Sequence, residues 1–431
     1  MKSHWIRALA LSQILAAAAM AQTFGGPSLM PVPYTGFPSY PSAGYQAWQA
    51  PHGYGAYPNT GYTPAQATAA GQPPVPVPPN GNGVYAEGVA GAGAACGDFD
   101  GCDNHPRWYI STAALFLKRD RGNDVPLTFD DVDVNNILIS SRPCSCEWDW
   151  GWEVTLGRQI CCGTAIEATY WGVANMEGAD LMIASAQASG ALNTFLNFGG
   201  LLFDDGTAVA PLFDTGVGAH LLTRTSTFHN VEINLVHEVC RDGGCGNGCG
   251  GGCGACRSWT CTWLAGIRYF HFHDDLLYAT SSDNEDFVFD ANEAYYDVDI
   301  QNHLVGAQIG ARLDWNIMSG SVSLWALPRV GLYANHVSHQ SNLVSLGRTA
   351  FDISSSKDDV AVIGQLDLGL DWHITDWLTA FGGYRVLGVA GVALPEEQIP
   401  PVMTMSTEIA SVDTSGHVIL HGAFVGMEVR W

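Results

Sequence analysis

The stretch "CEWDWGWEVTLGR", residues 146–158, places its large apolar side chains at every second position. Trp148, Trp150 and Trp152 come first, and Val154 and Leu156 continue the series. A carboxylate, a glycine or a threonine occupies each gap. Side chains two residues apart lie on the same face of a β-strand. The stretch therefore predicts a strand with one strongly apolar face and one polar or small face.

The same alternation recurs along the rest of the chain. Ten segments show it: 108–118, 148–158, 163–174, 219–239, 258–272, 296–316, 321–335, 358–373, 377–389 and 416–431. The first is ambiguous, because neither set of alternate residues in "WYISTAALFLK" is cleanly apolar. Short and long connections alternate, which is typical of bacterial outer-membrane barrels. We expect an all-β fold, an antiparallel transmembrane β-barrel of about ten strands, or twelve if 175–225 adds a hairpin.

Strand length and tryptophan position favour this barrel over a soluble β-sandwich. Several segments run 13–20 residues, whereas strands of globular proteins average about 5–6. Tryptophan prefers the headgroup level of a membrane. The predicted topology puts six tryptophans at strand ends, two at the outer rim and four at the periplasmic rim: Trp148 and Trp150, then Trp259, Trp315, Trp372 and Trp431.

The N-terminal part divides into two predicted segments. Residues 1–21 carry Lys2, Arg7, an apolar run and the small residues Ala19 and Ala21, which predicts a signal peptide cleaved before Gln22. Residues 22–106 are rich in Pro, Gly and Tyr and predict a disordered linker, with a Tyr-rich binding segment as the alternative. The barrel would occupy 107–431, in the bacterial outer membrane.

Composition limits the partners. The chain has 18 Lys+Arg against 42 Asp+Glu, a net charge of −24, which disfavours nucleic acid and anionic lipid headgroups. Charged residues make up only 14% of the chain and aromatic residues 11%, which suits a surface that faces lipid. We expect outer-membrane lipid as a partner, and other envelope components through the linker or acidic loops.

Charged residues also occupy inward positions of the predicted strands. The inward set is Glu153, Glu167, Glu232, Arg268, Arg312, Asp314, Arg329, Asp367, Asp371, Arg385, Glu428 and Arg430. These side chains either pair and fill a narrow barrel or line a pore for small solutes. An open pore would prefer cations, because acids are in excess.

Twelve cysteines in an exported chain predict disulfides. They are Cys96, Cys102, Cys144, Cys146, Cys161, Cys162, Cys240, Cys245, Cys249, Cys253, Cys256 and Cys261. Ten of them fall on the predicted periplasmic side, and the pairing stays open. The alternatives are a zinc site, since Cys253 and Cys256 have ligand spacing, and free thiols. We expect neither a metal nor a cofactor.

The acidic segment 273–299 carries nine acids and no Lys or Arg, and it predicts a solvated loop. A calcium site is the less favoured interpretation, because the ligand spacing of an EF-hand is missing.

Next to this segment, a group of histidines and aspartates lies at the outer end of the fifth strand: His271, His273, Asp274 and Asp275. Ten-stranded outer-membrane proteases place His and Asp pairs at that rim, where they activate water. No second such cluster and no G-x-S-x-G motif occurs, so we expect no enzyme, with a rim-sited protease as a remote alternative.

Four stretches carry a family resemblance: "RWYISTAALFLKRDR" at 107–121, "VEINL" at 231–235, "LAGIRYFHFHDDL" at 264–276 and "GYRVLGVAGVALPEEQIP" at 383–400. They resemble planctomycete-type outer-membrane β-barrel proteins, akin to the Legionella-type pore-forming major outer-membrane proteins. The resemblance implies a porin-like passive channel for small solutes and no catalytic residue. A closed structural or adhesive envelope barrel is the alternative.

Overall fold

The computed structural model describes residues 108–120, 124–141, 148–161, 163–184, 191–214, 217–239, 259–282, 287–317, 321–400, 402–404 and 406–431. The predicted signal peptide and linker lie outside the described residues.

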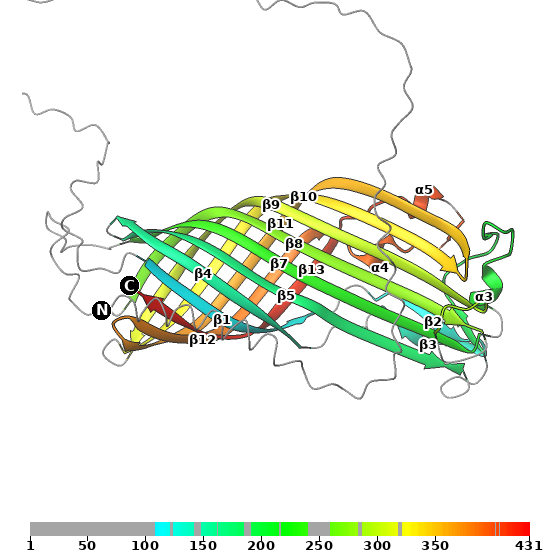
Figure 1. Ribbon diagram of the computed structural model, residues 1–431, viewed down its shortest axis with the longest axis horizontal. Helices are drawn as coiled ribbons and strands as arrows, with labels where there is room; N and C mark the ends of the chain where they lie inside the picture. Colours follow the sequence, from blue (N-terminus) through cyan, green and yellow to red (C-terminus); the bar gives the residue numbers. More distant parts are fainter. Residues whose placement is uncertain are drawn as a thin grey trace, which may run out of the picture. The chain divides into compact units, whose positions relative to one another are not determined.

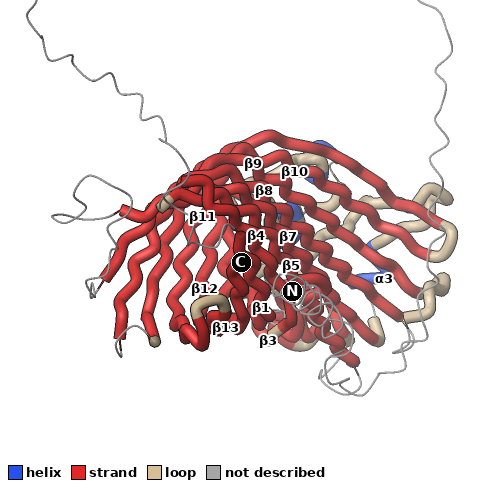
Figure 2. Tube along the Cα trace, turned by 60° about the vertical axis from the view of Figure 1, so that its left-hand side comes forward, coloured by secondary structure: helices blue, strands red, loops and turns tan. Residues whose placement is uncertain are grey.

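Ten strands form a closed antiparallel barrel, in the order β1-β13-β12-β11-β10-β9-β8-β7-β5-β4. Their bounds are β1 Trp108–Arg119, β4 Asp149–Cys161, β5 Thr164–Ile183, β7 Ala219–Val239, β8 Trp259–Ser281, β9 Glu293–Ile317, β10 Val322–Ser345, β11 Arg348–Thr375, β12 Leu378–Val392 and β13 Gly416–Arg430. All ten predicted segments lie on these strands, so the ten-stranded all-β prediction is confirmed. Figure 2 shows the strands side by side in one curved wall.

The first and last strands close the ring. Trp108 and Trp431 exchange backbone hydrogen bonds of 3.1 and 2.9 Å at one end of the barrel. We call this the terminal end and the opposite end the distal end (Figure 1). Consecutive antiparallel strands can be joined by a short turn. At the terminal end, β4 ends at Cys161 and β5 begins at Thr164, so only two residues connect them.

The strands reach farther toward the distal end than the sequence pattern predicts. β8 continues to Ser281 and β9 begins at Glu293, so most of the segment expected as a solvated acidic loop is paired strand. β10 and β11 likewise meet at a tight turn of Leu346 and Gly347. The expectation of long loops at these two places was wrong. Outward positions there are mostly polar, so the strands lack the apolar alternation that marks the terminal half.

Smaller elements lie at the distal end (Figure 1). Three short strands form a second sheet in the order β3-β2-β6: β2 Pro126–Asp130, β3 Asp133–Ser140 and β6 Leu192–Thr194. The helices are α3 Ala210–Asp214, α4 Pro395–Gln398 and α5 Ser406–Ile409. None of the helices in the described ranges has the length and apolarity to cross a membrane. The 175–225 segment contributes β6, α3 and parts of β5 and β7, so it adds no barrel strands.

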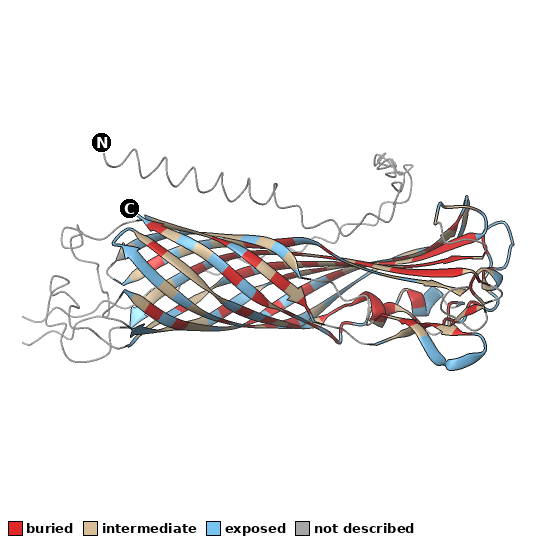
Figure 3. Cartoon of the chain, turned by 90° about the horizontal axis from the view of Figure 1, so that it is seen from below, coloured by how far each residue is buried: buried red, intermediate tan, exposed pale blue. Residues whose placement is uncertain are grey.

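The three alternate tryptophans of residues 148–152 share one face of the barrel wall, as their spacing predicts. Trp148, Trp150 and Trp152 are all exposed on the outer face of the wall, whereas Glu153 bonds to Arg385 in the interior. Bands of exposed and buried residues alternate along the strands of the terminal half (Figure 3).

Candidate functional site

The barrel interior is the candidate site, and a network of charges occupies it. Arg385 donates to Asp367 over 2.9 Å and to Glu153 over 2.6 Å. Arg329 donates to Asp367 over 2.7 Å and to Glu232 over 2.9 Å. These five residues come from β4, β7, β10, β11 and β12. The network therefore joins strands on different sides of the ring.

Glu232 is hydrogen-bonded by four different side chains. Its carboxylate accepts hydrogen bonds from Asn230, Asn234 and Gln308, besides the one from Arg329. Arg268 lies 3.6 Å from it. A buried charge is stable only when it is paired and hydrogen-bonded, and this acid meets both conditions.

The burial of these side chains shows that they fill the middle of the barrel. Glu232 is 1% exposed, Arg268 2%, Asp367 2% and Arg385 4%. A side chain that lined a water-filled channel would stay accessible to water. Water therefore has almost no access to these four side chains among the described residues.

A more open charged layer lies nearer the terminal end. Arg312 donates to Asp314 over 2.9 Å and to Asp371 over 2.5 Å. Glu167 accepts a hydrogen bond from the hydroxyl of Tyr109 at 2.5 Å. Arg430 and Glu428 form a further pair at 2.5 Å. The twelve charges that the sequence analysis placed inward are therefore all engaged in polar contacts.

An apolar layer of the interior was missed by the sequence analysis, which expected inward positions to be polar or small. Its buried members include Leu115, Leu117, Trp171, Phe228, Phe270, Phe272 and Leu304. The signal was present in two places. Leu115 and Leu117 point inward while Phe116 points outward, which explains why β1 showed no clean alternation. Alternate phenylalanines in "YFHFH" mark the same layer on β8.

A second buried charge cluster lies in the distal half. Asp274 accepts hydrogen bonds from Arg119 at 2.8 Å and from Arg224 at 2.5 Å. Arg224 also donates to Glu396 of α4 over 2.8 Å. Burial by itself would raise the pKa of Asp274, but the two guanidinium groups lower it to about 2. The cluster ties α4 to the inside of the wall.

The four residues of the protease hypothesis are divided between two faces. Asp274 points inward, whereas His273 points outward and bonds to Asp299 over 2.9 Å. Burial, and after it the neighbouring carboxylates of Asp297 and Asp299, together raise the pKa of Asp275 to about 7. His271 stacks on other histidine rings. The geometry does not bring the four together.

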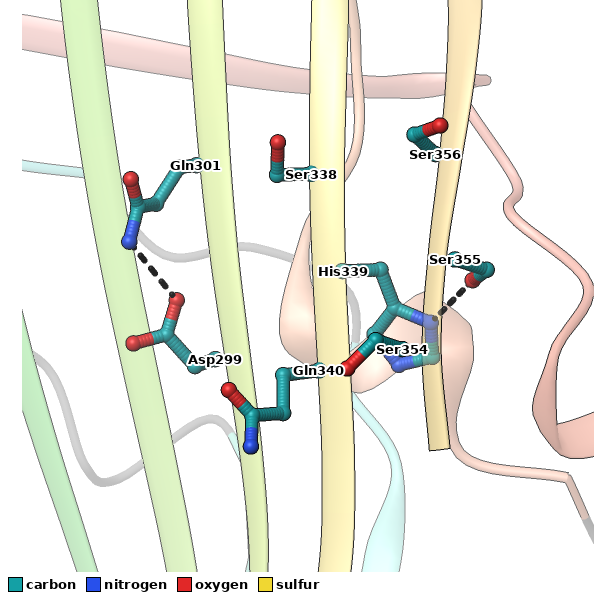
Figure 4. Close-up of a pocket in the computed structure, with 8 residues that line it drawn as sticks. All are labelled: Asp299, Gln301, Ser338, His339, Gln340, Ser354, Ser355 and Ser356. Atoms are coloured by element: carbon teal, nitrogen blue, oxygen red, sulfur yellow. Dashed lines mark hydrogen bonds between the residues drawn. The ribbon is translucent and has the colours of Figure 1, made fainter. Parts of the chain in front are cut away.

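A polar hollow of about 370 Å³ lies across β9, β10 and β11 in the distal half (Figure 4). Its lining is Asp299, Gln301, Ser338, His339, Gln340, Ser354, Ser355 and Ser356. His339 Nδ1 lies 3.0 Å from the hydroxyl of Ser355, and Gln301 donates to Asp299 over 3.4 Å. Across the ranges that the structure describes, no group of three or more His, Cys, Asp or Glu is arranged to hold a metal ion.

The outer face carries an exposed apolar band in the terminal half. It includes Leu156, Ile166, Val231, Ile233, Ile267, Val305, Ile309, Leu332, Val360, Leu370 and Val425. Five of the six tryptophans predicted at the rims, Trp148, Trp150, Trp259, Trp315 and Trp372, are between 40 and 56% exposed. Trp431 is half-buried.

One cysteine has a described side chain. Cys261, on β8, forms no disulfide with any residue that the structure describes. The other eleven predicted disulfide cysteines lie outside the described residues, except that the backbone of Cys161 ends β4. The predicted disulfides are therefore not supported at Cys261.

Comparison with known proteins finds outer-membrane proteins of low identity. The outer membrane protease OmpT of Escherichia coli is 7% identical at a TM-score of 0.39, and the match covers 76% of this chain and 98% of that one. A major outer membrane protein from Thermus thermophilus is 8% identical at 0.28, covering 74% and 99%. A FadL homologue of Pseudomonas aeruginosa is 10% identical at 0.26, covering 75% and 90%. No protein-family model and no curated protein matches the sequence, so the resemblance to one family stays a prediction.

Proposed function

We propose that this chain is a bacterial outer-membrane β-barrel with a closed interior, which serves as a structural or adhesive component of the cell envelope. The exposed apolar band supports the membrane placement. Leaving a large apolar side chain in water instead of burying it costs about 1.5–3 kcal/mol. A band of such residues around a closed wall is stable when lipid covers it.

The orientation follows from the chain ends. The predicted signal peptide and linker precede β1, which begins at the terminal end. A chain exported from the cytoplasm reaches the outer membrane from the periplasm, so the terminal end faces the periplasm and the distal end faces the exterior. The distal sheet and the helices then form the surface that other cells or envelope layers would contact.

The buried network of Glu153, Glu232, Arg329, Asp367 and Arg385 is the observation that favours a closed barrel. At about eight to ten strands, side chains are large enough to fill the lumen. The apolar layer next to the network adds a second obstruction, because ions cross an apolar constriction poorly. Together the two layers favour a scaffold over a channel.

Single-channel recording in planar bilayers tests this proposal. Insertion is first verified by heat-modifiable migration on a gel, and the wild-type chain is then expected to produce no discrete current steps. Steady cation-selective steps would contradict the closed barrel and support the porin-like channel that the sequence analysis predicts from the acidic excess. Recovery of the chain in a detergent-free soluble fraction would contradict the membrane placement itself.

We also propose that the chain is not an enzyme. Asp274 is held by two arginines on the face opposite His273, so these two neighbours in sequence do not form a His–Asp pair. A peptidase assay with acidic and basic peptides should show no cleavage. Cleavage that is lost in His273→Ala while the barrel still folds would support the protease alternative.

A further inference from the structure

Four histidines form a continuous row on the outer face of the barrel. His229 of β7 is the direct cross-strand neighbour of His271 of β8, which in turn faces His303 of β9 and then His336 of β10. The ring centroids of the first two lie 6.1 Å apart, and those of His271 and His303 lie 4.6 Å apart. We call these four residues the histidine row.

The row follows the distal edge of the apolar band. His229, His271 and His303 each lie two positions beyond an exposed apolar or tyrosine residue of the band, namely Val231, Tyr269 and Val305. On three of the four strands, the outward residue that follows the apolar band toward the distal end is therefore a histidine. In the proposed orientation this edge lies at the headgroup level of the outer leaflet.

Tyrosine hydroxyls lie within hydrogen-bond distance of two of the four rings. The hydroxyl of Tyr269 lies 2.9 Å from Nδ1 of His303, and that of Tyr170 lies 2.9 Å from Nδ1 of His229. The same contact recurs on the other side of the barrel, where the Tyr384 hydroxyl lies 2.6 Å from Nδ1 of His421. With Nδ1 engaged, each ring keeps Nε2 to bind another molecule.

Other polar groups bound the row. His336 Nδ1 lies 2.6 Å from the Asp358 carboxylate of β11, whereas at the other end of the row His229 lies opposite Gly172 of β5, which has no side chain. His271 Nε2 is buried and its ring stacks between His229 and His303, so the other three histidines present the Nε2 atoms that a headgroup can reach. Lys118 of β1 stands in register with His421 and adds a cation to the same edge.

We propose that the histidine row binds the phosphate groups of outer-leaflet lipid headgroups. An N–H donor forms its strong hydrogen bonds with ionised oxygens, and phosphate is the ionised group that lipids present at this depth. The net charge of −24 opposes anionic headgroups on average, but surface charges act only within about 8–10 Å in physiological salt. A chelated metal fits less well, given that the described residues offer no three-ligand group.

The inference rests on the proposed membrane placement, and nanodiscs test it with the full chain. The full chain is placed in discs of phosphatidylcholine with a minor share of phosphatidic acid. Native mass spectrometry then identifies the lipids that stay bound to the barrel. We expect phosphatidic acid to be enriched around the wild type. The triple variant His229→Gln, His303→Gln, His336→Gln should lose about tenfold of this enrichment, the effect of one hydrogen bond to a charged group.

The matched control is His237→Gln, an outward histidine near the terminal end, which should keep the enrichment. Excess inorganic phosphate should not abolish it, because the proposed ligand is the membrane-held headgroup. Equal enrichment in the wild type and the triple variant would overturn the inference, as would displacement by free phosphate. Failure of the wild type to enter even neutral discs would instead overturn the membrane placement.

Discussion

Arg385 of β12 donates a hydrogen bond of 2.6 Å to Glu153 of β4, although 232 residues separate the two in the chain. The same guanidinium also holds Asp367 of the neighbouring strand β11. One buried arginine therefore spans the interior and links three strands of the ring. Its side chain is only 5% exposed, so these carboxylates, and not water, are the main partners of the guanidinium.

Arg385→Ala should destabilise the barrel strongly. The substitution leaves Glu153 without its cation and leaves Asp367 with Arg329 as its remaining arginine, and breaking a buried pair costs about 3–5 kcal/mol. The free energy of unfolding in urea, read from the heat-modifiable gel band, measures it. Arg430→Ala is the control, because that ion pair is about half exposed and is worth about 1 kcal/mol or less. Similar losses in both variants would refute the central role of Arg385.

Gly306→Ala should impair folding of the wall. A Cβ atom at this position would overlap the carbonyl oxygen of Leu332 and the Cα atom of Tyr333 on β10. The two backbones would have to separate, so the yield of folded barrel should fall. Gly364→Ala provides the comparison, since a Cβ there meets no atom within 4 Å. The prediction fails if the two alanine variants refold equally well.

Stability of the β8–β9 hairpin beyond the apolar band should decrease as pH rises. Burial raises the pKa of Asp275 to about 7 and that of Asp297 to about 6, whereas an unfolded aspartate titrates near about 4. The folded state therefore binds more protons in this interval, and its stability is present below about pH 4 and lost as pH rises through about 7. The measurement is the protection factor of residues 273–299, that is, the hydrogen-exchange rate corrected for its intrinsic pH dependence, at about pH 5 and about pH 8.

The variant Asp275→Asn should flatten this dependence, because it removes the group with the larger shift. Asp352→Asn, at an exposed position of β11, should leave the dependence as in the wild type. Exchange rates in the hairpin that keep the same pH dependence in Asp275→Asn would exclude this carboxyl as the cause.

Cys261→Ser should leave stability almost unchanged. Cys261 has no disulfide partner among the described residues, so a loss of less than about 1 kcal/mol is expected. Removing a true disulfide would cost about 2–5 kcal/mol. Urea unfolding without reductant, with a non-reducing gel beside it, distinguishes the cases. A loss in the larger range together with a changed mobility would show that Cys261 is bridged.

The wall of the terminal half was predictable because its two faces meet different surroundings. Apolar residues at every second position, as in Trp148, Trp150 and Trp152, specify both the strand and the side that faces outward. Inward charges such as Glu232 and Arg329 followed from the same parity. The distal strands were not predictable in this way, since their outward residues resemble those of a solvated loop.

The sequence by itself determined an all-β barrel of about ten strands, the outward face of all of them except the first, and the presence of opposite charges inside, because a period of two is a local property of the chain. Only the tertiary structure decided which charges pair and how far the barrel is filled. Those outcomes depend on the register of ten strands around a closed ring, which brings Arg385 to Glu153 and sets the four histidines side by side. A stretch of sequence carries no record of that register, because each strand pairs with neighbours on both sides and the ring must close.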